Sequence, residues 1–357
     1  MTLFHLQRSL ISVRAVVLPA MLVLLAGASE VSNALTTNEH HTPVLLHQTQ
    51  TAVQFDDRSM AITFGPVDLP VAHQGDLAAS LPKHIFELPH DVVFIGFQAS
   101  IFSEDGSALP RYYLHHLLLI NTERESLTCP GELYFLAGAG QEMTDARFPQ
   151  GYGLKLKKGT RLMAIAAFYH DVPKSKGVMA SLRMEIAPRG ASVKELEAYH
   201  IGINVGCYTK LAQRADDEAD EGIQLPSGLL VRTGVLRFRT DACVKFAYPH
   251  GHDQLVLMTL ENQTMGQTLL RTVPNITTDG LLIGFSPEHV YTDRLGFSVN
   301  TQDAYQMTMV YHRPLHDDLQ RYGMANYVLY FSPGPCLPES DPDQENKQDH
   351  FLIKVRE

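Results

Sequence analysis

The chain has 357 residues, of which 45% are hydrophobic and 19% charged, and it contains no tryptophan. This composition is typical of a globular protein long enough to form two domains. The formal net charge of −10 at pH 7 argues against a nucleic-acid-binding surface, because such surfaces are usually basic.

Residues 1–34 have the pattern of a secretory signal. Arg8 and Arg14 precede an apolar run at 15–26, and small residues continue to Ala34. A basic start, an apolar centre and a small-residue exit are the parts of a signal peptide, whereas the run is short for a membrane span. We therefore expect a secreted or otherwise extracytoplasmic protein, in the periplasm or the secretory pathway. It would meet a membrane only if the leader is not cleaved.

Four cysteines remain after removal of this leader: Cys129, Cys207, Cys243 and Cys336. An even number in an oxidising compartment permits two disulfides, but the spacing does not define their connectivity. The alternative is that some of them are buried thiols.

Residues 35–59 are mostly polar, and we expect them to form an extended N-terminal arm. From residue 60 onward, short apolar runs alternate with Gly, Pro, Asp and His, and none is long enough for a good helix. This spacing predicts an antiparallel β-sandwich over residues 60–190. Its expected strands include Met60–Phe64, Asp91–Phe97, Tyr112–Ile120 and Arg161–His170.

Pro188–Ser192 breaks the pattern, Val193–Ala198 has the composition of a short helical turn, and we place a domain boundary there. A second β series follows in residues 199–337, and residues 338–357 form a polar tail. The acidic run Ala215–Glu221 fits a solvated loop better than a metal-attracting patch. The expected strands are Gly228–Arg232, Val235–Arg239, Gln254–Leu260, Thr268–Arg271 and Gln306–Tyr311. The predicted fold is therefore all-β, with two tandem antiparallel β-sandwich domains of jelly-roll type.

The strongest chemical signal in the second domain is Phe246-Ala-Tyr-Pro-His-Gly-His252. Side chains two residues apart on a strand point to the same face, so His250 and His252 could bind one metal ion. Met324 could complete the site from a neighbouring strand. Two imidazoles and a thioether suit copper, because imidazole binds both oxidation states and soft thioether favours Cu(I). The alternative is a pair of ordinary surface or core histidines.

A second histidine cluster lies upstream. His115 and His116 occur in the middle of a strongly apolar run, where burying two imidazoles costs free energy unless both find partners. Adjacent side chains on an ideal strand face opposite sides. One metal can therefore bind both only if the strand bends or if Nδ1, the nearer ring nitrogen, coordinates. His170, which ends another apolar run, is the candidate third ligand; structural histidines are the alternative.

The order of these residues along the chain resembles that of the copper type II, ascorbate-dependent monooxygenases, the family of peptidylglycine α-hydroxylating and dopamine β-monooxygenases. The resemblance runs from about Asp91 to Phe331. Connecting landmarks that match are Val93–Gly96, Phe148–Gly153, which resembles the family's Leu-Pro-x-Gly-x-Gly, and Leu225–Gly228, which resembles its Ile-Pro-x-Gly. The matching ligand positions are His115, His116 and His170 for the first copper site, and His250, His252 and Met324 for the second.

The resemblance implies two copper ions, one per domain, facing each other across a water-filled gap. The all-histidine copper would accept electrons from ascorbate. The copper held by His250, His252 and Met324 would be the catalytic one, where O2 reacts and a substrate C–H bond is hydroxylated. The implied function is an exported copper- and ascorbate-dependent monooxygenase, an oxidoreductase whose partners are O2, ascorbate and a small-molecule or peptide-like substrate.

The sequence departs from the peptide-amidating members at two positions that hold the substrate's carboxylate, which are Tyr248 and Val328 here. Asn326 does match a substrate-contacting position, so Asn326 and Tyr248 are the candidate substrate-binding residues. A peptide carboxylate is therefore a poor candidate for the bound group. The family's dense set of disulfides is also largely missing.

Two other functions stay open. A copper-binding or copper-delivery protein on the same two-domain scaffold would keep the ligands without turnover. A cupin oxygenase would need a glutamate four or five residues beyond the His250–His252 pair. Leu257 stands there and the nearest glutamate is Glu261, which argues against a cupin.

Overall fold

β-Strands make up almost all of the regular structure in this computed structural model, so the prediction of an all-β protein with antiparallel sheets is confirmed. The structure describes residues 50–69, 79–80, 83–128, 131–169, 176–203, 223–278, 281–286, 291–315 and 322–336. The predictions for the leader, the acidic run 215–221, the tail, Cys129, Cys207 and His170 lie outside these residues. Within them, no helix is long and apolar enough to cross a bilayer.

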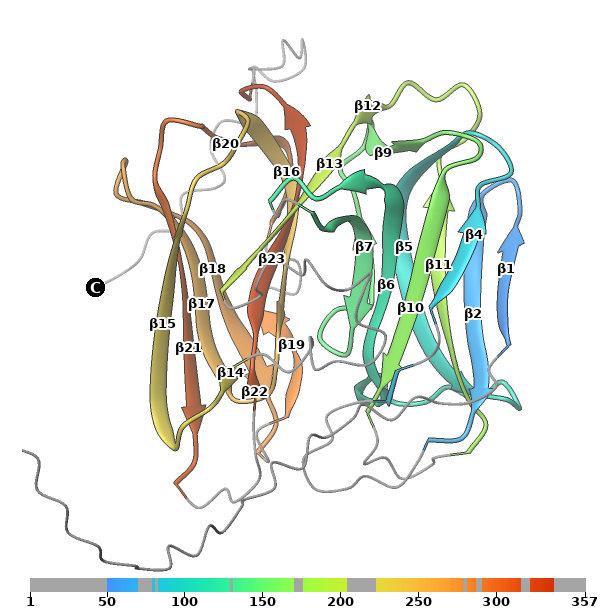
Figure 1. Cartoon of the computed structure of the whole chain (residues 1–357), viewed down its shortest axis with the longest axis horizontal. Helices are drawn as coiled ribbons and strands as arrows, with labels where there is room; N and C mark the ends of the chain where they lie inside the picture. The colour runs from blue at the N-terminus through green and yellow to red at the C-terminus, as the bar shows by residue number, and fades with distance from the viewer. Residues whose placement is uncertain are drawn as a thin grey trace, which may run out of the picture. The chain divides into compact units, whose positions relative to one another are not determined.

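The first half of the chain forms two sheets (Figure 1). The larger has the order β1-β2-β11-β5-β9-β12, with β8 also paired to β5, and only the β9–β12 pairing is parallel. Its strands are β1 (Thr51–Phe55), β2 (Ser59–Val67), β5 (Val92–Ser103), β8 (Asp145–Arg147), β9 (Tyr152–Leu156), β11 (Val178–Ile186) and β12 (Lys194–Glu195).

The smaller sheet has the order β3-β10-β6-β7, with β4 also paired to β10. A 3-10 turn, η1 (Arg111–Tyr113), leads into its central strand β6. The strands are β3 (Ala79–Ser80), β4 (His84–Glu87), β6 (Leu114–Glu125), β7 (Leu133–Gly140) and β10 (Arg161–Phe168).

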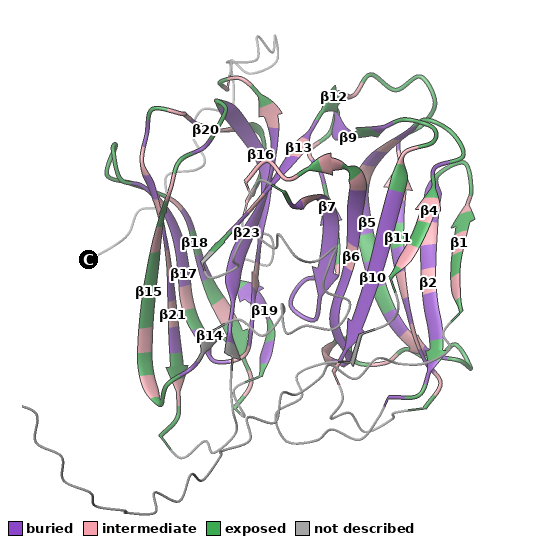
Figure 2. Cartoon of the chain, in the orientation of Figure 1, coloured by how far each residue is buried: buried purple, intermediate pink, exposed green. Residues whose placement is uncertain are grey.

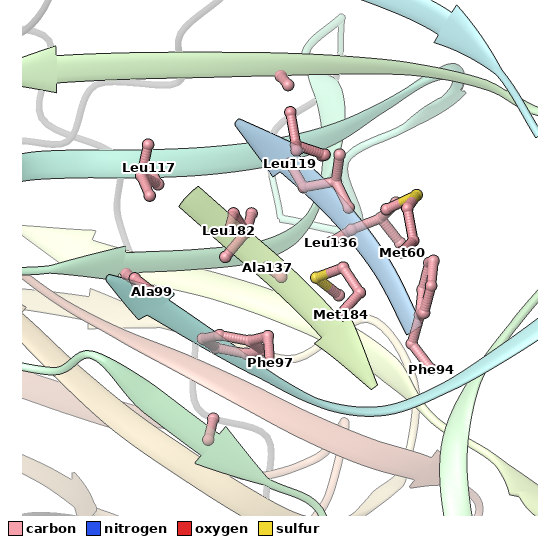
Figure 3. Packing of buried hydrophobic residues seen from close by; sticks show 14 of the residues in the cluster. Met60, Phe94, Phe97, Ala99, Leu117, Leu119, Leu136, Ala137, Leu182 and Met184 are labelled. Carbon is pink, nitrogen blue, oxygen red and sulfur yellow. The ribbon is translucent and has the colours of Figure 1, made fainter. Parts of the chain in front are cut away.

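Period-two alternation explains why these two sheets pack together. In β11, Val178, Ala180, Leu182 and Met184 are buried while most residues between them are partly exposed. The same cluster contains residues of β2, β5, β6 and β7, so the two sheets share one core. Figure 3 shows part of it, with Met60, Phe94, Phe97, Ala99, Leu117, Leu119, Leu136, Ala137, Leu182 and Met184 labelled. β10 is buried along nearly its whole length (Figure 2), as expected of a strand covered on both faces.

The last residues of the predicted extended arm 35–59 belong to a sheet in the structure. Thr51–Phe55 form β1, which pairs with β2 from Thr51–Phe64 to Phe55–Met60. The alternation in this short segment places Val53 and Phe55 against the core. Its polar neighbours hid that pattern in the sequence.

The second half forms three sheets. A four-stranded sheet has the order β13-β23-β16-β20, a five-stranded sheet the order β15-β21-β17-β18-β19, and β14 pairs with β22. Their bounds are β13 (Glu197–Ile203), β14 (Ile223–Gln224), β15 (Gly228–Leu236), β16 (Ala242–Gly251), β17 (Leu255–Asn262), β18 (Gln267–Ile276), β19 (Leu282–Ser286), β20 (Tyr291–Val299), β21 (Tyr305–Arg313), β22 (Tyr322–Gly323) and β23 (Ala325–Pro333). A second core cluster joins the four- and five-stranded sheets.

The predicted helical turn at Val193–Ala198 is wrong. The segment is extended: β12 pairs with β9 of the first half, and β13 pairs with β23 of the second. The chain therefore changes sheets between Glu195 and Glu197. Pairing on both sides overrides the helical propensity of Lys, Glu, Leu and Ala, which is only a weak preference.

The central strands of the four-stranded sheet, β16 and β23, are buried on both faces. One face belongs to the second core, whereas Phe246, Tyr248, Val328 and Tyr330 belong to the core of the first half. The Tyr330 hydroxyl donates to the Leu136 carbonyl of β7 at 2.9 Å. The first half is therefore packed directly against this face, which also carries the candidate metal ligands.

One disulfide joins Cys243 at the start of β16 to Cys336, just beyond β23, with a Cα–Cα distance of 4.8 Å. These residues are 93 positions apart, and the strands that they tie together are neighbours in the four-stranded sheet. This settles one of the pairings that the sequence left open.

Candidate functional site

The second histidine pair continues an apolar strand face. Phe246 and Tyr248 on β16 point into the core of the first half, and the alternation of a strand carries the same direction on to His250 and His252. The rings of His250 and His252 are 5.7 Å apart between centroids. The local structure therefore places both side chains on the same face of β16, as predicted.

Met324 lies opposite His252. β16 pairs with β23 through Gly251–Ala325 and His250–Asn326, and the His252 N–H donates to the Met324 carbonyl at 3.2 Å. Directly opposed residues in an antiparallel pair share a face with their Cβ atoms about 5 Å apart. The sheet thus places His250, His252, Met324 and Asn326 on the face that is packed against the first half.

The Tyr311 hydroxyl fixes the backbone at this point. It accepts the N–H groups of His252 and Met324, each at 3.1 Å, and donates to the Met324 carbonyl. Tyr311 is 1% exposed, and burial raises the pKa of its hydroxyl. The neutral hydroxyl is therefore retained, and one side chain of β21 ties the two ligand-bearing segments together.

The first pair depends on a strand irregularity. The register of β6 and β10 shifts between Ala167–His116 and Phe168–Leu114, so His115 is the extra residue. Such a bulge re-aims side chains locally. The rings of His115 and His116 consequently lie 4.7 Å apart although the residues are adjacent in sequence. This is the bend that joint coordination would require.

The two pairs meet. The His115 ring is 5.5 Å from the His252 ring and 5.0 Å from the Tyr169 ring. This geometry differs from the expected water-filled gap between the two copper sites, because the rings of His115 and His252 lie against each other. The reason is the shared core, which holds the histidine-bearing face of β16 against the first half.

A carboxylate from the first half also reaches the second pair. Glu142 Oε1 lies 2.5 Å from His250 Nδ1, and the side chains are 4% and 18% exposed respectively. The other described candidate ligands are more buried than His250: His115, His116, His252 and Met324 are 5%, 7%, 6% and 5% exposed. Among the described ligands of this cluster, solvent therefore reaches mainly His250.

Two side chains near these histidines, Tyr169 and His200, have pKa values shifted toward their neutral forms. Burial raises the pKa of Tyr169 well above its ordinary value, and nearby Asp253 and Glu142 raise it further. Burial, together with the charge of His250, lowers the pKa of His200 to about 4, and a hydrogen bond with Asn326 opposes that shift. Neutral imidazole, not imidazolium, is the form that binds a metal.

Within the described ranges, no group of three or more His, Cys, Asp and Glu side chains has an arrangement that could hold a metal ion. Neither predicted ligand set has three described members of these four residue types. The third member of the first set, His170, follows the last described residue of that segment, and the third member of the second set is Met324. Tyr169, the neighbour of His170, contacts His115.

No protein-family model matches the chain, and no curated protein sequence matches it. Among solved structures, the major capsid protein P2 from bacteriophage PM2 aligns with 77% of this chain and 98% of its own, at 10% identity and a TM-score of 0.30. PNGF-II aligns with 82% of this chain and 66% of its own, at 10% identity and a TM-score of 0.32. Likeness at this level carries no inference about function.

The candidate substrate residues lie in different surroundings. Tyr248 is 3% exposed and packs near Phe97 and Tyr330 inside the shared core. Asn326 is equally buried but is paired in register with His250. Asn326 is therefore the member of this pair that lies beside the metal-ligand candidates.

Sequence reasoning missed Glu142, Tyr169 and Tyr311. Gln141-Glu142 follows a strand of small residues, Ala137–Gly140, and polar side chains after such a strand were the available signal for Glu142. Tyr311 lies on an alternating strand and carried no signal, because its partners are backbone groups on other segments, at His252 and Met324.

Proposed function

We propose that this protein is an exported copper-dependent monooxygenase that hydroxylates a C–H bond of its substrate with O2 and ascorbate or another one-electron donor. The observation that carries the proposal is the convergence of both histidine pairs, with the His115 and His252 rings 5.5 Å apart and Met324 opposite His252. Ring contacts connect all four of these histidines, from His116 to His115, from His115 to His252 and from His252 to His250.

The donor set fits copper. Imidazole nitrogen binds Cu(I) and Cu(II), and the soft thioether favours Cu(I). Burial restricts water around these side chains, which is one way in which a protein tunes a metal's redox behaviour. In the full proposal, two tandem jelly-roll-like domains meet at residues 191–198. The first holds copper through His115, His116 and His170, and the second through His250, His252 and Met324.

Copper bound there would supply one-electron transfer and the activation of O2. The chain's own residues hold the ligands and limit access. His250 is the most exposed of the described candidate ligands, so the substrate would approach from its side, beside Asn326. Ascorbate donates electrons singly whereas hydroxylation consumes two, and the close approach of the pairs suits transfer between them.

A second candidate function is copper binding or delivery without turnover. It is favoured by the burial of four candidate ligands to 7% exposure or less, which leaves little open surface for a substrate. Oxygen consumption with copper and ascorbate separates the two functions, because a delivery protein would bind the metal but would not turn over.

The test is metal analysis followed by oxygen uptake. We expect the mature protein to bind about two copper ions per chain, as one ion per ligand set requires. The double variants His115→Ala/His116→Ala and His250→Ala/His252→Ala should each lose one of them. His312→Ala is the matched control, since His312 is exposed on β21. Copper content that stays at one ion, or preferential retention of zinc at both sites, would contradict the proposal.

A further inference from the structure

Glu142 is a charged side chain buried at the junction of the two halves. It follows β7 in the turn before β8, and its side chain is only 4% exposed. Carboxylates are almost never buried to this extent unless they are paired. The partner here is His250 of β16, whose Nδ1 lies 2.5 Å from Glu142 Oε1.

The backbone around Glu142 is built to hold the carboxylate in this position. Gly140 and Met143 exchange backbone hydrogen bonds of 3.0 and 3.3 Å, which close a tight turn with Glu142 inside it. A Cβ atom at Gly140 would lie 2.5 Å from Glu142 Oε2 and 2.9 Å from Oε1. The glycine therefore leaves the space that the carboxylate fills.

The contact decides which ring nitrogen of His250 is available. A carboxylate that accepts a hydrogen bond from Nδ1–H fixes the tautomer with its lone pair on Nε2 and holds the ring plane. His252 is supported differently, through its backbone N–H and the Tyr311 hydroxyl. His250 is thus the member of the pair whose ring nitrogen is paired with a carboxylate of the first half.

We propose that Glu142 is the positioning residue of His250: it presents Nε2 of this histidine as a metal ligand, so that the first half completes the second half's metal site. This inference rests on the proposed copper function. It implies that the second ligand set binds metal at full strength only while the two halves are packed together.

The experiment compares Glu142→Gln, Glu142→Asp and Glu142→Ala with the wild-type chain. Copper affinity is measured by chelator competition, and the copper(II) signal by electron paramagnetic resonance. Loss of a carboxylate that supports a metal-bound histidine typically weakens metal binding by about 10–100-fold. We expect that loss at one of the two copper equivalents in Glu142→Ala. Glu142→Asp should behave similarly, because the shorter side chain cannot reach Nδ1. Glu142→Gln should lose less, because its amide oxygen can still accept the hydrogen bond.

Gly140→Ala tests the same contact without changing either partner, since its added methyl group displaces the carboxylate. Glu185→Gln is the control, because Glu185 forms an exposed ion pair with Arg147 on the larger sheet of the first half. The melting temperature of each metal-free variant separates a positioning role from a general loss of stability. Glu142→Gln is isosteric and Glu142→Asp keeps the charge, so these two decide the test if Glu142→Ala does not fold.

Unchanged copper affinity and an unchanged resonance signal in Glu142→Gln and Glu142→Asp would overturn the inference about Glu142. Failure of the proposed function gives another pattern. In that case the wild-type chain binds no copper that His250→Ala/His252→Ala removes, and the Glu142 variants have nothing to weaken.

Discussion

His250 and His252 are separated by one residue on β16, whereas His115 and His116 are adjacent on β6, and the two strands bring their imidazoles together by different means. β16 needs only regular alternation, because residues two apart share a face. β6 needs a register shift opposite Ala167 and Phe168. The comparison shows that an alternate pair is a property of local geometry, while an adjacent pair depends on how the neighbouring strand is aligned.

The two strands also differ in how they are held. β16 is tied to the end of β23 by the Cys243–Cys336 disulfide, and the Tyr311 hydroxyl bonds the backbone beside His252 and Met324. β6 lies between β10 and β7 in a sheet whose core is almost entirely apolar. The segment of the second pair therefore has a disulfide and hydrogen bonds from a side chain to the backbone in addition to its strand pairing, whereas β6 pairs with two strands over an apolar core.

The largest expected effect comes from removing the disulfide. Because Cys243 and Cys336 are 93 residues apart, Cys243→Ala/Cys336→Ala should lower the free energy of unfolding by about 4–5 kcal/mol on the chain-entropy estimate. Chemical denaturation of metal-free protein measures it. A loss below about 1 kcal/mol would show that strand pairing and the core hold β16 without help from the disulfide.

Met324→Ile should separate ligation from packing at the second pair. The variant keeps apolar bulk and strand propensity, so its stability should change by less than about 1.5 kcal/mol. Loss of the thioether should weaken Cu(I) binding more than Cu(II) binding, and ascorbate-driven oxygen consumption should fall by about 100-fold or more, which corresponds to about 2.7 kcal/mol. The copper bound by the first pair should remain.

The melting temperature, copper content and oxygen uptake of Met324→Ile are measured on a single preparation. Lower stability with unchanged activity per folded molecule would identify Met324 as a structural residue. Full activity with unchanged Cu(I) affinity would remove Met324 from the site.

Tyr311→Phe should affect only the second pair. The variant loses the hydroxyl that three backbone groups share, which should cost about 1–3 kcal/mol of stability because buried N–H groups lose a partner. Copper affinity should fall at the second ligand set and not at the first. The matched control is Tyr305→Phe on the same strand, whose hydroxyl bonds Asn300 away from the site. Equal copper affinity in both variants would contradict the role of Tyr311.

The last expected effect is a pH dependence of stability on the side of the first pair. Glu132 precedes β7, the strand that pairs with β6, and it is 9% exposed with no hydrogen-bond partner for Oε1 among the described residues. Burial raises the pKa of Glu132 from 4.5 to about 7. Since the folded state favours the protonated form, this stabilisation is complete below pH 4.5 and is lost as the pH rises through about 7.

Glu132→Gln stays neutral and should not lose that stability. Between pH 5 and pH 8, the free energy of unfolding of the wild-type chain should fall by up to about 3 kcal/mol relative to this variant. Denaturant unfolding of metal-free protein at the two pH values measures the difference. Glu123→Gln, at an exposed position of β6, should follow the wild-type chain. Parallel pH profiles for wild type and Glu132→Gln would show that Glu132 is charged throughout.

Much of the fold could be predicted from the sequence. The runs at Met60–Phe64, Asp91–Phe97 and Gln306–Tyr311 lie within β2, β5 and β21 apart from Asp91, which precedes β5. Each alternates or is continuously apolar over a strand's length, and that signal is local. Val193–Ala198 was predicted as a helical turn because its composition is helical, and only its pairing with β9 and β23 makes it extended.

The candidate site divides in the same way. The sequence by itself determined that His250 and His252 share a face with Phe246 and Tyr248, because alternation is a property of any strand. It did not determine that this face packs against the first half, that β6 bulges at His115, or that Glu142 reaches His250. These features depend on contacts between residues more than 50 positions apart, such as Ala167 with His116, Glu142 with His250 and Tyr330 with Leu136. Packing of whole sheets creates such contacts, and no local pattern encodes which faces will meet.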